Sequence, residues 1–165
     1  MIGNKMRDAI NKQINKELYS AYLYLAMSAE VELKGYKGTA KWFQVQFQEE
    51  MGHAMKFKSY LLEQGAEVEL MAIAKPATGF KSVLAMFEAT LKHEKFITSS
   101  INELMDIAVK EKDYASQILL QWYITEQVEE EASDNEIIVT LKMAGSSTGA
   151  LLMIDKQLGK REVKA

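Results

Sequence analysis

Apolar side chains recur every three or four residues along most of this chain, which is the pattern of amphipathic α-helices. Glycines interrupt the pattern and divide it into segments. Four of the segments are long and the last is short: about residues 4–34, 39–64 and 82–110, from Asp113 to just before Gly145, and about 150–158. The pattern therefore predicts an all-α fold with four long helices and a short fifth, C-terminal helix.

The connections between these segments predict how the helices are arranged. Residues 35–38 form a tight turn, so the second helix should run antiparallel to the first. Residues 66–80 contain the only proline, Pro76, and about fifteen extended residues reach roughly 45–50 Å. A helix of about 26 residues spans about 39 Å, so this segment can start the third helix parallel to the second. We therefore expect a four-helix bundle with one long crossover, and we predict Asn4 and Asp113 as N-caps.

Each long apolar stripe is interrupted by an acid near the middle of its helix. The apolar members of the stripe on the second helix are Phe43, Phe47, Ala54, Phe57 and Leu61. The polar residues at these positions are Glu17, Glu50, Glu94 and, on the fourth helix, Gln127 and Glu130. Because the midpoints of bundled helices meet at one level, these side chains should form a single central layer. His53 lies three residues after Glu50 and therefore projects from the same helix face.

Buried acids at this level require compensation by cations. Removing a carboxylate from water costs several kcal/mol, and a whole domain has only about 5–15 kcal/mol of net stability. No lysine or arginine lies on the stripes at this level, so we infer that metal ions supply the positive charge. Carboxylates with one imidazole suit iron or manganese, and their number suits two metal ions bridged by Glu50. The ligand types do not exclude zinc as the metal. The alternative to a metal site is a structural helical bundle whose acids face trapped water.

Composition narrows the classes of function further. The chain has 165 residues, 48% of them hydrophobic and 26% charged, so we expect one domain over residues 1–165. It has no cysteine, which excludes disulfides, iron–sulfur clusters and thiolate zinc sites. The net charge of −3 gives no support for nucleic-acid binding. No signal peptide or membrane-spanning run is visible, so we expect a cytoplasmic protein without a membrane partner.

The motifs resemble those of the ferritin family, and most closely its non-haem bacterial and archaeal branch. The resemblance covers nearly the whole chain and rests on residues 17–24 (ELYSAYLY), 49–53 (EEMGH), Glu94 and the segment 122–131 (WYITEQVEEE). It implies the ferritin-like variant of the four-helix bundle. It also implies an iron-storage ferroxidase that oxidises Fe(II) with dioxygen or hydrogen peroxide. The ferric mineral would be stored in a hollow shell of 24 identical subunits, with the fifth helix at its fourfold channels.

The same resemblance assigns individual residues to a ferroxidase centre. One iron would be held by Glu17, Glu50 and His53. The other would be held by Glu50, Glu94 and Glu130, with Gln127 beside it. A third iron position would be formed by Glu49, Glu126, Glu129 and Glu130. Tyr24, two turns after Glu17, matches a tyrosine that hydrogen-bonds near the centre and donates an electron.

Two departures from related groups limit what the resemblance implies. Bacterioferritins carry Glu-x-x-His on the fourth helix, where this chain has Gln127 and Glu130. Met51 matches the position of their haem-ligating methionine but also suits non-haem members, so we expect no haem. Animal ferritins line a threefold channel with acids where this chain has Gln117 and Leu120. The sequence therefore does not determine the route by which iron enters.

Other members of the wider family remain as alternatives. A haem-containing bacterioferritin is one, and a DNA-protecting mini-ferritin is another, although that group builds its site between subunits and usually lacks the fifth helix. A rubrerythrin-like peroxidase is disfavoured because the chain has no cysteine.

Overall fold

A computed structural model describes residues 2–163, and all regular structure among them is helical. The five helices are α1 (Asn4–Leu33), α2 (Lys37–Glu63), α3 (Val83–Glu111), α4 (Tyr114–Ala144) and α5 (Thr148–Leu158). The predicted all-α fold with four long helices and one short helix is confirmed. None of the helices in the described part of the chain combines the length and apolar character needed to cross a membrane.

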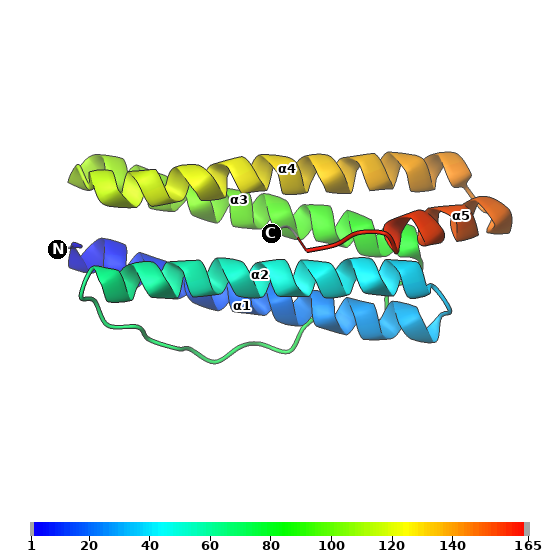
Figure 1. The fold of residues 1–165 in the computed structure, drawn as a ribbon, viewed down its shortest axis with the longest axis horizontal. Coiled ribbons are helices and arrows are strands. Elements are labelled where there is room, and N and C mark those ends of the chain that lie inside the picture. The colour runs from blue at the N-terminus through cyan, green and yellow to red at the C-terminus, as the bar shows by residue number, and fades with distance from the viewer. Residues whose placement is uncertain (1, 164–165) are drawn as a thin grey trace.

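The four long helices form a bundle of two antiparallel pairs, α1 with α2 and α3 with α4 (Figure 1). After α2 the chain runs back along the outside of the bundle for most of its length, so α3 starts at the same end as α2 and runs parallel to it (Figure 1). The predicted long crossover is confirmed. Side-chain bonds from α1 hold it in place: Asn11 donates to the Glu67 carbonyl at 3.0 Å, and Glu30 accepts from the Gly79 amide at 2.8 Å.

The two predicted N-caps had different outcomes. Asp113 caps α4, where its carboxylate accepts a hydrogen bond from the Ser116 amide at 3.0 Å. Asn4 is wrong as the cap of α1, because Gly3 holds that position and its carbonyl already accepts from the Arg7 amide at 3.0 Å. The Asn4 side chain instead accepts from the Arg7 guanidinium at 3.2 Å.

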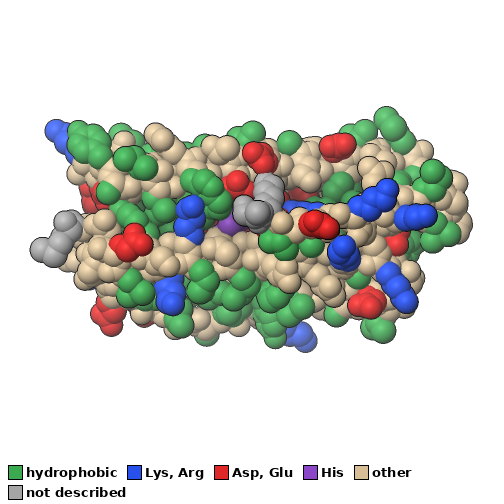
Figure 2. Space-filling view, in the orientation of Figure 1, with side chains coloured by type: hydrophobic (Ala, Val, Ile, Leu, Met, Phe, Trp, Pro, Cys, Tyr) green, Lys and Arg blue, Asp and Glu red, His purple; other side chains and the backbone are tan. Residues whose placement is uncertain are grey.

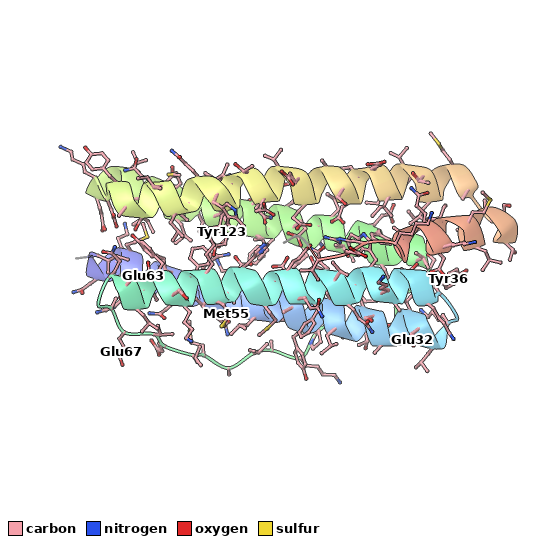
Figure 3. The ribbon with its side chains drawn as sticks, viewed as in Figure 1. Glu32, Tyr36, Met55, Glu63, Glu67 and Tyr123 are labelled. Atoms are coloured by element: carbon pink, nitrogen blue, oxygen red, sulfur yellow. The ribbon has the colours of Figure 1, made fainter. Side chains whose placement is uncertain are left out.

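The core consists of two apolar clusters with a polar layer between them. One cluster, around Phe57, Leu61 and Tyr123, fills the end of the bundle where α1 starts. The other, around Phe43 and Phe87, fills the end near α5. Figure 3 shows Tyr123 directed between the helix pairs, in line with its 1% exposure. The acids predicted from the stripes lie between the clusters, so apolar packing on both sides fixes their level.

The fifth helix lies at one end of the bundle and packs against α2 and α4 (Figure 1). The Asp155 carboxylate accepts from the amides of Gly38 and Thr39 at 3.0 and 2.7 Å, which places a negative charge at the N-terminus of α2. A side chain at Gly38 would place its Cβ 1.8 Å from the Asp155 carbonyl oxygen, so only glycine fits there. This contact directs the chain after α5 back over the bundle.

Basic and acidic side chains are interspersed with apolar ones on the face shown in Figure 2, which carries no broad area of one charge. Several large apolar side chains are exposed on the single chain, among them Leu33 (92%), Ile118 (71%) and Met153 (75%). These three side chains lie on α1, α4 and α5, respectively.

Candidate metal centre

The four long helices bring all the predicted central side chains into one buried layer. Their exposed fractions are at most 5%: Glu17, Glu50, Glu94, Glu130, Gln127 and His53. Carboxylates are rarely buried to this degree unless they are paired or bind a metal.

Glu17 from α1 and Glu50 and His53 from α2 form the tightest group. Each offers one ligand atom, and these three atoms lie within 4.8 Å of one another. The Nδ1 atom of His53 lies 3.4 Å from Oε2 of Glu50. A single ion can therefore contact both carboxylates and the imidazole, a ligand set that suits iron.

Glu94 is held from two sides. The Tyr24 hydroxyl donates to Oε1 of Glu94, and Nε2 of Gln127 donates to Oε2 at 3.0 Å. The Gln127 amide also donates to the Glu94 carbonyl at 3.2 Å. Tyr24 and Gln127 therefore fix the orientation of this carboxylate, and neither donates to the other acids of the layer.

Gln46 joins the two carboxylates on the opposite side. Its Nε2 donates to Oε1 of Glu50 at 3.2 Å and to Oε2 of Glu130 at 2.9 Å. The apolar pattern missed this residue, because it placed Phe47 on the buried stripe. In the structure Gln46 is fully buried and Phe47 only partly so. The signal that could have found it is its position one turn before Glu50.

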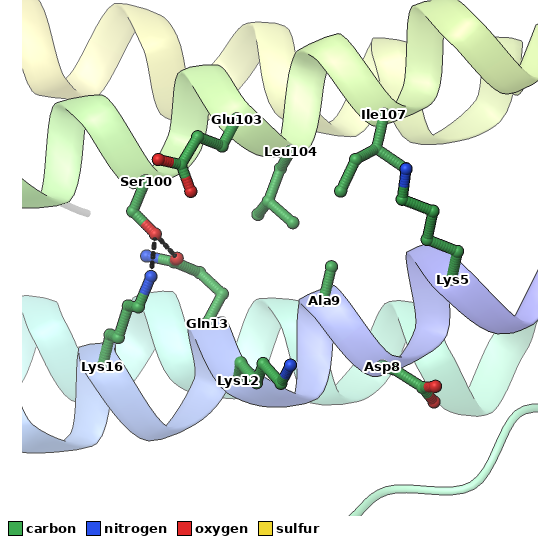
Figure 4. Close-up of a pocket in the computed structure, with 10 residues that line it drawn as sticks. All are labelled: Lys5, Asp8, Ala9, Lys12, Gln13, Lys16, Ser100, Glu103, Leu104 and Ile107. Atoms are coloured by element: carbon green, nitrogen blue, oxygen red, sulfur yellow. Dashed lines mark hydrogen bonds between the residues drawn. The ribbon is translucent and has the colours of Figure 1, made fainter.

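Gln13 orients Glu17 and was also missed. Its Nε2 donates to Oε1 of Glu17 at 2.8 Å, and its Oε1 accepts from the Ser100 hydroxyl at 2.5 Å. Lys16 donates to the same hydroxyl. Figure 4 shows the bonds of Ser100 with Gln13 and Lys16 at the edge of a cavity of about 570 Å³ between α1 and α3. A line of hydrogen bonds thus connects Glu17 with the surface.

Burial and mutual repulsion raise the pKa values of these acids. Burial, followed by the nearby Glu50 charge, raises the pKa of Glu17 to about 8. Burial and the Glu130 charge raise the pKa of Glu94 to about 7. Burial, with repulsion from Glu94 and Glu130, also holds the pKa of Glu50 well above its usual range. Cations at the centre would remove this penalty.

Some buried acceptor atoms at the centre have no hydrogen-bond donor. They include Oε2 of Glu17 and Oε1 of Gln46. An unsatisfied buried acceptor is costly, and a bound cation satisfies it. The donor set at the centre therefore fits iron.

The residues expected at a third iron position differ in their burial. Glu126 is partly buried and Glu129 is exposed, which agrees with a more solvated position, whereas Glu49 is only 9% exposed. Glu49 and Glu126 line a cavity of about 450 Å³ together with His53. This group lies beside the central layer and opens to solvent.

The inference that all positive charge must come from metal is wrong for this side of the site. Arg161, in the segment after α5, places Nη2 2.5 Å from Oε2 of Glu49. The helix stripes carry no such cation, but the path of the chain after α5 was not predictable from periodicity. Burial raises the pKa of Glu130, and the positive charge of the same guanidinium offsets part of this increase.

Asp134 is a further buried acid to which the sequence assigned no role. It is 1% exposed, and neither carboxylate oxygen has a hydrogen-bond partner among the described residues. Burial and the charges of Glu94 and Glu130 raise its pKa to about 9. It therefore extends the acidic layer one helical turn beyond Glu130. His93, the second histidine of the chain, bonds to the Ser20 hydroxyl at 2.7 Å, and burial lowers its pKa to about 4.

A four-helix bundle with a long crossover, four buried carboxylates and a histidine at its centre defines a carboxylate-type metal-binding protein. The chain belongs to the ferritin family, since the ferritin-like domain model matches residues 7–144. The predicted family and the predicted ferritin-like fold are thereby confirmed. Family membership supports a role in iron storage.

Curated relatives and solved structures agree with this assignment. The chain is 42% identical to a probable bacterial non-heme ferritin-like protein of Haemophilus influenzae, and the match covers both chains completely. It is 40% identical to a bacterial non-heme ferritin of Bacteroides fragilis, over 98% of this chain and all of the relative. An open pore ferritin from Archaeoglobus fulgidus superposes with a TM-score of 0.97 at 46% identity, over 98% of this chain and all of that one. A humanized archaeal ferritin superposes with a TM-score of 0.99 at 45% identity, and both chains are fully covered.

Proposed function

We propose that this protein is an iron-storage ferroxidase that oxidises Fe(II) at a di-iron site in the centre of its bundle. The observation that carries the proposal is the buried layer of carboxylates, in which the ligand atoms of Glu17, Glu50 and His53 lie within 4.8 Å of one another. The layer lies within one chain, which favours this function over a mini-ferritin, whose site lies between subunits.

Fe(II) is the substrate, and the side chains divide it between two positions. Glu17, Glu50 and His53 bind one ion. Glu50, Glu94 and Glu130 bind the other, with Gln127 beside it. Glu50 bridges the two, because it lies between His53 on one side and the Gln46 amide that also bonds to Glu130 on the other.

The electron balance explains why two positions are needed. Each Fe(II) loses one electron, and dioxygen takes two electrons and two protons to become hydrogen peroxide. Peroxide as the oxidant takes two electrons and two protons to become two waters. Binding a pair of ions side by side supplies both electrons at one place. The acids of the layer are partly protonated near neutral pH, so Fe(II) binding releases protons from Glu17 and Glu94.

Tyr24 and the glutamines position the ligands. Tyr24 donates to Glu94 and is close enough to supply an electron to the centre. Gln13 and Gln46 hold Glu17 and Glu50 in the orientations described above. Such supporting bonds keep ligating carboxylates in place when metal binds.

Storage requires an enclosed space, and we propose a cytoplasmic shell of 24 subunits that holds the ferric mineral. The exposed apolar side chains on α1, α4 and α5 support contacts between subunits. Glu49, Glu126 and Glu129 form a third, weaker position that passes iron from the centre toward the mineral. We expect no haem, because the fourth helix carries Gln127 and Glu130 where bacterioferritins carry Glu-x-x-His.

Stopped-flow absorbance after mixing apoprotein with Fe(II) and air tests the proposal. A fast phase that saturates at two Fe(II) per subunit is expected, followed by accumulation of iron that co-elutes with the assembled protein. Glu63→Ala, an exposed change on α2, serves as the control and should keep this phase. Slow oxidation with no break at two equivalents would contradict the proposal. Sedimentation separates a 24-subunit shell from a dodecamer.

A further inference from the structure

Arg161 lies over the acidic cluster next to the proposed di-iron site. Its Nη2 lies 2.5 Å from Oε2 of Glu49, and the two side chains are only 18% and 7% exposed. Its guanidinium also lies over the Trp42 ring, 4.3 Å from the ring centroid. Arg161 is thus bound by a charge-assisted hydrogen bond on one side and by a cation–π contact on the other.

The tether of Arg161 is short, and its anchor is firm. Leu158, the last residue of α5, is buried, and the Arg161 amide donates to its carbonyl at 3.1 Å. Residues 162–163 are exposed beyond it. The guanidinium can therefore move away from Glu49 by rotation of its own side chain or by a small movement of residues 160–163, while α5 stays docked.

The cavity beside this contact gives metal ions access to Glu49. It has a volume of about 450 Å³ and is lined by Glu49, Glu126 and His53, with Val163 at its edge. Cations that enter it reach the carboxylate to which Arg161 is bound. The segment that carries Arg161 also forms part of the cavity wall.

We propose that Arg161 is a displaceable counter-cation of Glu49, so that its contact with Glu49 and a metal ion at the third position exclude each other. This inference rests on the proposed function, because it concerns the third position defined there. The ligand is a divalent or trivalent cation that prefers carboxylate oxygens.

Competition follows from the geometry and the charges. A metal ion bound to the Glu49 carboxylate would lie close to a guanidinium already at hydrogen-bond distance from Oε2, and the two positive charges repel each other. When the ion leaves, Arg161 returns and compensates the buried carboxylate. The third position is then loaded only briefly, which suits transfer of iron to the mineral and makes Arg161 a control on how long iron stays there.

Titration calorimetry of the assembled apoprotein with Zn(II), which is redox-inert, tests this exclusion. Wild type, Arg161→Gln and Lys160→Gln are compared, since Lys160 is exposed and its loss removes the same charge from the same segment. Arg161→Gln should tighten the third Zn(II) equivalent at least about tenfold relative to Lys160→Gln, the order expected for loss of a charge-assisted contact. The affinities for the first two Zn(II) equivalents should change equally in the two variants.

A spectroscopic readout follows the displacement itself. In a Trp122→Phe background the remaining tryptophan is Trp42, whose ring Arg161 covers. The third Zn(II) equivalent should change its fluorescence when Arg161 is present and leave it unchanged in Arg161→Gln.

The outcomes separate the two proposals. If the apoprotein binds no tight pair of Zn(II) ions, the proposed di-iron site fails. Alternatively, the pair binds, but Arg161→Gln fails to bind the third Zn(II) equivalent more tightly than Lys160→Gln does. That result overturns only the displacement proposal. A Trp42 signal that is unaltered by the third equivalent in the Arg161-containing protein overturns it as well.

Discussion

The metal-free protein should lose stability as the pH rises from 5 to 7, because its central acids resist ionisation. The pKa of Glu17 is raised from 4.5 to about 8, and that of Glu94 to about 7. Between these limits the folded chain binds protons that the unfolded chain has already released. The contribution of these groups to stability is therefore complete below pH 4.5 and is lost as the pH rises through the folded-state pKa values.

The expected size of the effect follows from the same shifts. Each proton retained only by the folded state lowers the free energy of unfolding by about 1.4 kcal/mol per pH unit. From pH 5 to 7 this amounts to roughly 2–3 kcal/mol for Glu17 and slightly less for Glu94. Asp134, whose pKa is raised from 3.8 to about 9, adds a loss of roughly 2–3 kcal/mol over the same range. Because the carboxyl groups interact, their titrations overlap, and we expect a combined loss smaller than the sum of these three figures.

Guanidinium-induced unfolding at pH 5, 6 and 7, followed by circular dichroism, measures this slope. Glu17→Gln keeps the shape of the side chain but removes its titration. The loss of unfolding free energy per pH unit should therefore be smaller than in wild type by about 1 kcal/mol. Glu63→Gln, an exposed change on α2, should keep the wild-type slope. Loading with Zn(II) should flatten the wild-type profile. A stability that rises from pH 5 to 7, or equal slopes in wild type and Glu17→Gln, would refute the reasoning.

Three further predictions concern the reaction. Glu50→Ala should abolish fast Fe(II) oxidation more completely than loss of any other single ligand, because Glu50 serves both ions. The shell should still assemble, and near-normal initial rates by stopped flow would disprove the bridging role. Gln46→Leu should slow the same phase about 10–100-fold, because it frees two carboxylates at once; an unchanged rate would show that these bonds do not position the ligands. Changing Glu49, Glu126 and Glu129 together to Ala should preserve the first fast oxidation but alter the oxygen consumed per iron in an oxygen electrode, and loss of that first phase would place these acids in the catalytic pair.

Matched controls are available for the first two of these variants on the same helix. Gln44 and Glu63 of α2 are exposed, so Gln44→Leu and Glu63→Ala change side-chain chemistry without touching the central layer. Both should oxidise Fe(II) at the wild-type rate.

The level of the central layer was predictable because four independent stripes each carry an acid at their midpoint. Apolar clusters on both sides then keep these acids at that level, as the burial of Glu17 and Glu94 shows. The crossover was predictable from chain length alone. These features depend on periodicity and reach, which a sequence displays directly.

The side chains that support the layer were less predictable, because a shift of one residue around a helix decides which side chain is buried. Gln46 took the buried position that the pattern had assigned to Phe47, and polar residues such as Gln13 carry no apolar signal. Arg161 lies beyond the last helix, where no periodicity indicates the path of the chain. Its position depends on how Asp155 docks α5 onto the start of α2, a contact that only the folded structure reveals.

The most direct test of the central claim is a crystal structure of the protein soaked anaerobically with Fe(II), with the ions located by anomalous scattering at the iron edge. The account predicts two strong peaks in each subunit, one between Glu17, Glu50 and His53 and the other between Glu50, Glu94 and Glu130. A third, weaker peak near Glu49 should be accompanied by movement of Arg161. Iron only at the surface, or none within the central layer, would contradict the account.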